Sequence, residues 1–139
     1  MNPAIIPAGI FVIISIIGLA KKNREIFLTG YMLYGILVFF VEFKGYMGGG
    51  DKYQLFVSFL WLCQAVMCIP KKVPYDSLSV KEARIKILAC LTLINITGFL
   101  ESGISPAPEI TFWFHVILSI LPLIVIYLLS SGKIQMEKT

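Results

Sequence analysis

The stretch IFLTGYMLYGILVFFVEFKGYM, residues 26 to 47, decides the class of this protein. Its 22 residues contain only two charged side chains, Glu42 and Lys44, and both lie close to its end. A bilayer hydrocarbon core of about 30 Å is crossed by roughly 20 mostly apolar helical residues. The stretch therefore predicts a transmembrane helix, which the three glycines at 48–50 bring to an end.

The composition of the whole chain agrees with this prediction. Of its 139 residues, 58% are hydrophobic and only 14% are charged. Soluble domains contain roughly 45 to 50% apolar and about 25% charged residues. The chain is therefore expected to be an integral membrane protein that forms a single transmembrane domain over residues 1–139, with the lipid bilayer as its main surrounding.

Further apolar runs of similar length lie on both sides of the first, separated by charges, glycines or prolines. The sequence predicts an all-α membrane protein, a bundle of five transmembrane helices. Ser79 and Glu82 at the start of the fourth helix match a capping box, in which each side chain bonds the other residue's amide. The expected spans are 3–20, 26–47, 53–70, 80–103 and 110–131.

The distribution of basic residues predicts the orientation, since short cytoplasmic loops are rich in Lys and Arg. With the N-terminus outside and the C-terminus cytoplasmic, every Lys and Arg except Lys44 and Lys52 lies on the cytoplasmic side. The first apolar run carries its positive charges after it, which favours an uncleaved anchor over a signal peptide. We expect a multi-pass protein of a bacterial or archaeal cytoplasmic membrane. The net charge of +4 reflects this topology and does not indicate nucleic-acid binding.

The sequence carries no motif of a known catalytic chemistry. It contains neither a phosphate-binding loop nor a G-x-S-x-G elbow, and a single histidine cannot supply two axial haem ligands. Its three cysteines lack metal-ligand spacing. We therefore expect no catalytic residue, no metal and no cofactor, and a protein that is not an enzyme.

Polar residues gather near the predicted outer ends of the spans. Glu42, Glu101 and His115 lie at similar shallow depths, each on a helical stripe with small or polar neighbours, which favours orientation toward other helices. One interpretation is structural: solvation of helix ends, ion pairing and hydrogen bonds that fix the bundle. Another is a pocket for a small solute, a proton or a lipid headgroup, and a metal site is a third. The candidate pocket comprises Glu42, Glu101, His115, Asn95, Gln64, Asp51 and Glu109.

Two segments carry a resemblance to a known family. The stretch LCQAVMCIPKKVP, residues 62–74, followed by KEARIKILACLTLINITGFLESG, residues 81–103, resembles the second half of DoxX-like small membrane proteins. The resemblance covers the second to fifth predicted helices, and the additional first helix departs from the four spans usual in that family. It implies a four-helix core and a role beside membrane redox systems, and it transfers no catalytic residue.

The small size, short loops and missing catalytic motifs lead to one main hypothesis for function. We expect a non-enzymatic subunit or accessory of a membrane assembly, with membrane-protein partners or further copies of itself. The alternative is a transporter or channel for a small solute, proton or cation that uses the outward-facing polar cluster. A second alternative is the redox-associated role that the DoxX-like resemblance implies.

Overall fold

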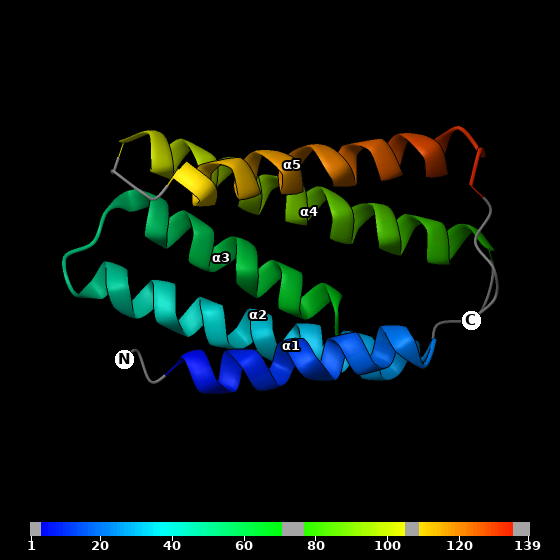
Figure 1. The fold of residues 1–139 in the computed structure, drawn as a ribbon, viewed down its shortest axis with the longest axis horizontal. Helices are drawn as coiled ribbons and strands as arrows, with labels where there is room; N and C mark the ends of the chain where they lie inside the picture. Colours follow the sequence, from blue (N-terminus) through cyan, green and yellow to red (C-terminus); the bar gives the residue numbers. More distant parts are fainter. Residues whose placement is uncertain (1–3, 71–76, 105–108, 135–139) are drawn as a thin grey trace. The chain divides into compact units, whose positions relative to one another are not determined.

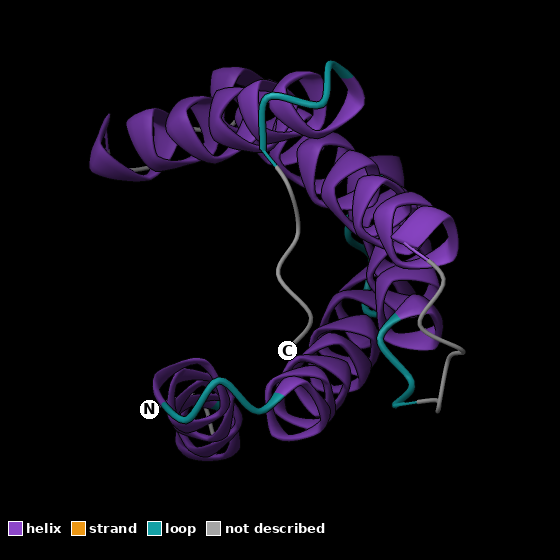
Figure 2. Cartoon of the chain, turned by 90° about the vertical axis from the view of Figure 1, so that its right-hand side faces the viewer, coloured by secondary structure: helices purple, strands orange, loops and turns teal. Residues whose placement is uncertain are grey.

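In the computed structural model, the described residues are 4–70, 77–104 and 109–134, and within them every regular element is a helix (Figures 1 and 2). Side chains in the second range are described from residue 80 to residue 100. The predicted all-α architecture with five helices is therefore confirmed. In chain order the helices are α1 (Ile5–Ala20), α2 (Arg24–Met47), α3 (Lys52–Met67), α4 (Ser77–Ile104) and α5 (Glu109–Ser130).

Two predicted bounds differ from the structure by three residues: the start of α4, which is Ser77 and not residue 80, and the end of α3. The helix stops at Met67, three residues earlier than expected, and Cys68 caps it by donating its amide to the Gln64 carbonyl at 3.0 Å. Proline disfavours helical backbone in the residue before it. Pro70 therefore disfavours helical backbone at Ile69, so α3 ends before the proline.

The chain divides into two compact units, and each is described by itself. In the first unit α2 packs against both α1 and α3, and in the second unit α4 packs against α5. The single transmembrane domain expected from the sequence stays a prediction.

Two glycines bring α1 and α2 into close contact. A Cβ atom at Gly18 would overlap the backbone of Phe27, and a Cβ atom at Gly30 would lie 2.6 Å from Ser15 Oγ and 2.7 Å from Ser15 N. Small residues let helix backbones approach closely in membrane proteins. The turn that joins the helices is short, and Asn23 caps α2 by accepting a hydrogen bond from the Ile26 amide at 3.1 Å.

Aromatic side chains and a third glycine join α2 to α3. The Trp61 ring meets Tyr34 edge to face with ring centroids 5.3 Å apart, and it meets Tyr31 similarly at 6.3 Å. A Cβ atom at Gly35 would lie 3.2 Å from Ala65 Cβ, so the two helices are close at this point too. The connecting turn contains Gly49 with φ of +100°, a conformation that L side chains rarely adopt.

Helices α4 and α5 run antiparallel. Lys81 contacts the carbonyl of Ser130 at one end of the pair, and the Phe99 and Phe112 rings meet with centroids 5.8 Å apart toward the other end. On α5 the small residues Ser119 and Pro122 are buried. The remaining circumference of α5 carries exposed large apolar side chains, including Ile117 and Leu121.

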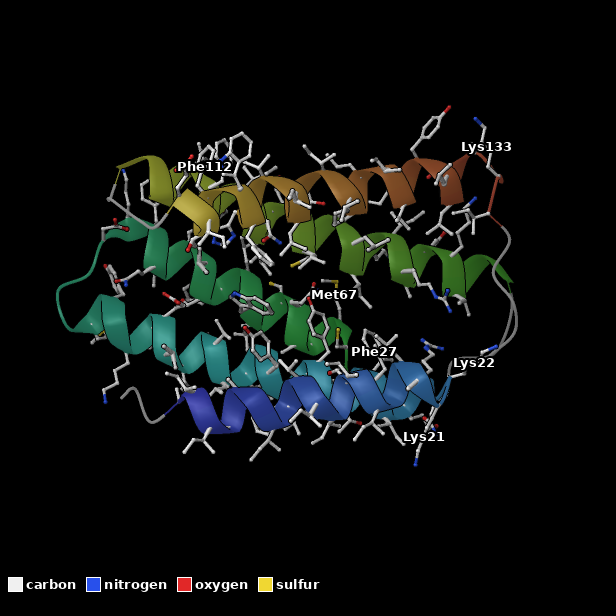
Figure 3. The ribbon with its side chains drawn as sticks, in the orientation of Figure 1. Lys21, Lys22, Phe27, Met67, Phe112 and Lys133 are labelled. Carbon is white, nitrogen blue, oxygen red and sulfur yellow. The ribbon has the colours of Figure 1, made fainter. Side chains whose placement is uncertain are left out.

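Three helical segments are long and apolar enough to cross a membrane: Arg24–Met47, Val80–Leu100 and Glu109–Ser130. Helix α1 is also apolar but has 16 residues, and α3 has the same length. At 1.5 Å per residue, each of these two helices is about 24 Å long. The sticks in Figure 3 show many apolar side chains pointing outward from α1.

Candidate functional site

The most developed polar contact in the second unit joins Asn95 of α4 to His115 of α5. Asn95 Oδ1 lies 3.1 Å from His115 Nδ1, and the Asn95 side chain is 4% exposed. The other end of the amide, Nδ2, donates a hydrogen bond to the Leu91 carbonyl at 2.8 Å. Because this bond fixes the amide with Oδ1 toward the imidazole, His115 Nδ1 must carry the proton and donate it.

Gly98 provides the space for the imidazole. A Cβ atom at this position would lie 2.7 Å from His115 Cε1, 2.8 Å from Nδ1 and 2.9 Å from Nε2. The edge of the ring therefore lies directly against the α4 backbone. His115 follows the first residue of α5, Glu109, by six positions, which corresponds to about 9 Å along the helix axis.

Other buried hydroxyl groups in this unit bond to their own helices. Thr92 donates to the Leu88 carbonyl at 3.0 Å, and Thr97 donates to the Leu93 carbonyl at 2.9 Å. The same kind of bond within α5 satisfies Ser119. By contrast, no hydrogen bond to His115 Nε2 is found among the described residues. This nitrogen is the acceptor that the fixed tautomer leaves available.

A second polar group lies between α2 and α3 in the first unit. Gln64 is fully buried, and its Nε2 lies 3.3 Å from the Tyr31 hydroxyl, to which it donates. Within the described part of the chain its Oε1 has no hydrogen-bond partner. Trp61 stands against the Tyr31 ring. The side chain thus joins two helices, which matches the structural interpretation of an amide within a span.

The two acidic residues expected in the outer loops lie at helix starts. Asp51 caps α3, because its Oδ1 accepts a hydrogen bond from the Tyr53 amide at 2.6 Å. Glu109 is exposed in the first turn of α5, where a negative charge is favoured by the helix dipole. These positions give both residues a structural role in starting a helix.

Of the candidate pocket residues, the structure brings Asn95 and His115 together. Glu42 is half-buried on α2 in the other unit, and the side chain of Glu101 lies outside the described residues. The expected convergence of Glu42, Glu101 and His115 therefore stays a prediction. The capping box of Ser79 and Glu82 also stays a prediction, because the Ser79 side chain lies outside the described residues as well.

Sequence reasoning missed the part played by Gly98. The signal was available, since Gly98 follows Asn95 by three positions and so lies one helical turn along the same face. What the sequence did not provide is the partner helix that the glycine admits.

Among the described residues, no group of three or more His, Cys, Asp or Glu side chains could hold a metal ion.

Comparisons of the chain with protein-family models, with curated proteins and with solved structures gave no match. The DoxX-like resemblance of residues 62–74 and 81–103 accordingly stays a prediction.

The Asn95 contact predicts one tautomer of the chain's only histidine. We expect ¹⁵N NMR of the labelled protein in micelles to show His115 protonated at Nδ1 and unprotonated at Nε2 under conditions that keep the ring neutral. Asn95→Leu removes the acceptor and should abolish this preference. Thr97→Val is the matched control, because Thr97 bonds to its own helix and its loss should leave the tautomer unchanged. A proton on Nε2 in the unmodified protein would contradict the assignment.

Proposed function

We propose that this chain is a multi-pass membrane protein with five spans, an external N-terminus and a cytoplasmic C-terminus, and that it serves as a non-enzymatic subunit or accessory of a larger membrane assembly. The observation that carries the proposal is the separation of polar from apolar side chains. In α4 and α5 the polar groups of Asn95, His115 and Ser119 are buried or half-buried, whereas α5 exposes most of its large apolar residues.

Helix α1 supports the membrane setting. Six of its large apolar side chains are more than half exposed, whereas Ser15 and Gly18 are buried against α2. In water such a surface would be unfavourable, because apolar area left in contact with solvent costs roughly 25 cal/mol per Å². In a bilayer the same surface meets lipid. The exposed residues are Ile5, Ile6, Ile10, Ile13, Ile16 and Leu19.

The short lengths of α1 and α3 are compatible with five spans. Each is about 24 Å long, against a hydrocarbon core of about 30 Å. A bilayer accommodates a short helix by local thinning at a modest energetic cost. Lys21 at the end of α1 and Lys52 at the start of α3 can also extend their ammonium groups to the interface.

The accessory role follows from where a partner could make contact. The turns at 21–23 and 48–51 are three and four residues long, between α1, α2 and α3 as the structure bounds them. Asn23 and Asp51 in these turns are used as helix caps. A protein partner would therefore meet mainly the apolar helix surfaces within the bilayer, as subunits of membrane assemblies do.

Photo-crosslinking in native membranes tests this role. A photoreactive side chain at Ile117, which is 53% exposed on α5, should yield a discrete protein adduct larger than the 15.6 kDa chain. The same group at Ser119, which is buried on α5, is the control and should yield little adduct. Crosslinking only to lipid, together with a purely monomeric protein in mild detergent, would contradict the proposal.

The available Nε2 of His115 favours one alternative function, transfer of a proton or a small hydrogen-bonding solute. Ionisable residues within spans often mark such pathways. In proteoliposomes containing a trapped pH indicator, this alternative predicts a proton flux that His115→Phe abolishes. Flux equal to that of empty liposomes would argue against proton transfer and leave the accessory role.

A further inference from the structure

The last turn of α5 fixes the position of a lysine. Gly132 has φ of +72°, and the amides of Gly132 and Lys133 bond to the carbonyls of Leu129 at 3.3 Å and Leu128 at 3.1 Å. This is the Schellman arrangement, in which a glycine in the left-handed region ends the helix and the next residue folds back over it. These backbone hydrogen bonds fix the position of the Lys133 main chain after the helix. The side chain extends from there, and its Nζ lies 5.3 Å from the centroid of the Tyr127 ring (Figure 3).

A second lysine reaches the same turn from α4. Lys81 Nζ lies 3.5 Å from the Ser130 carbonyl, to which it donates. An ammonium group has three donors, so this bond leaves two available. The contact of Lys133 with the Tyr127 ring is made through its charge and uses no strong acceptor. Both lysines therefore retain hydrogen-bonding capacity where α4 begins and α5 ends, which is the open end of the α4–α5 hairpin.

Basic residues outnumber acidic ones at this end of the unit, within the described part of the chain. Arg84 and Lys86 follow Lys81 on α4, and Glu82 is the only acidic residue of the described chain at this end of the unit. Tyr127 is 60% exposed and brings a hydroxyl donor to the same turn. Tyrosine is typical of membrane interfaces, because its ring is apolar and its hydroxyl can hydrogen-bond to water.

Apolar surface continues from this charged end along α5. Leu123 and Ile124, which are 50% and 48% exposed, precede Tyr127 by four and three positions, so all three lie on one face. A ligand that combines a phosphate group with acyl chains matches this arrangement, in which two lysines are followed by an exposed apolar face of α5. Its phosphate would meet the lysines and its chains would lie along α5.

We propose that the end of the α4–α5 hairpin binds the phosphate of an anionic lipid, with Lys81 and Lys133 as the charged donors and Tyr127 beside them. The cytoplasmic location of this end rests on the proposed topology, and the cytoplasmic leaflet is where anionic lipids supply a negative surface. The two lysines contribute electrostatic attraction, and their contacts with Ser130 and Tyr127 place both of them at the last turns of α5.

Binding of defined lipids to the purified protein in neutral detergent tests the proposal. The probes are phosphatidylglycerol, phosphatidylcholine as the lipid without net charge, and inorganic phosphate as the phosphate source without acyl chains. Lys81→Gln with Lys133→Gln should weaken phosphatidylglycerol binding about 25-fold, since each basic residue near an anionic surface contributes about 1 kcal/mol, or about fivefold. Phosphatidylcholine binding should not change.

A matched variant keeps the charge change and moves it elsewhere. Lys21→Gln with Lys22→Gln removes two exposed lysines from the α1–α2 turn and should alter phosphatidylglycerol affinity by no more than about twofold. Lys81→Arg with Lys133→Arg should retain binding, because the charges remain. Circular dichroism of each variant should show unchanged helicity, so that loss of binding is not loss of fold.

Several results would overturn the proposal. Equal weakening by the two pairs of Gln substitutions would mean that any lysine attracts the lipid. Unchanged affinity in Lys81→Gln with Lys133→Gln would mean that these residues do not bind it. Inorganic phosphate that competes as well as the lipid would mean a site for free phosphate. Because micelles have no sides, an incorrect topology would not change these results, and the two proposals can fail separately.

Discussion

Replacing Gly30 by alanine should destabilise the contact between α1 and α2 and lower the free energy of unfolding by about 1 to 3 kcal/mol, the usual cost of overpacking. The added Cβ would lie 2.7 Å from Ser15 N and 2.8 Å from the Phe11 carbonyl oxygen. Both atoms belong to the backbone of α1, so a change of side-chain rotamer cannot relieve the overlap. The helices must move apart.

Unfolding by a denaturing detergent in mixed micelles, followed by circular dichroism, measures this effect. Gly9→Ala is the matched control, because Gly9 is an exposed glycine of α1 with no atom within 4 Å of the added Cβ. It should keep or slightly raise stability, since alanine is favoured over glycine within a helix by roughly 0.5 to 1 kcal/mol.

A third variant isolates the cause. Ser15→Gly with Gly30→Ala removes the Ser15 hydroxyl but leaves its amide in place, so it should not restore the stability lost in Gly30→Ala. If Gly30→Ala were as stable as the unmodified protein, α1 and α2 would not be in close contact at this glycine.

Most of the fold could be predicted from the sequence, because the number and approximate bounds of helices depend on local features. Apolar runs of sufficient length and the breakers between them are visible in one dimension. The predicted end of α3 is too late because Ile69 continues the apolar run, although it precedes Pro70 and helical backbone is disfavoured there. The capping role of Asp51 was also readable, since an acidic residue after a glycine run commonly starts a helix.

The candidate site could be predicted only in part. Sequence spacing placed His115 on a polar stripe, and Asn95 was only one of several further polar residues in the candidate pocket, so nothing in the sequence paired the two. The contact with Asn95 depends on the register between α4 and α5, which Gly98 sets by admitting the ring. Such a register arises from packing between two helices and is not encoded in either helix by itself. The same limit applies to Gln64, whose partner Tyr31 lies 33 residues away.

Labelling of single cysteines in intact cells tests the central claim, five spans with the N-terminus outside, most directly. The background carries alanine at Cys63, Cys68 and Cys90, and each variant adds one exposed cysteine. Gly48→Cys is suited to the outer turn because Gly48 has φ of −82°, and Lys21→Cys lies in the turn at the other end of α2. The 24 residues of α2 separate these turns by about 36 Å.

For the second unit, Glu109→Cys marks the start of α5 and Lys133→Cys its end. The proposed topology predicts that a membrane-impermeant maleimide labels Gly48→Cys and Glu109→Cys in intact cells. Lys21→Cys and Lys133→Cys should be labelled only after permeabilisation. Labelling of Lys21→Cys in intact cells, or equal labelling of both ends of α2, would contradict the proposed topology.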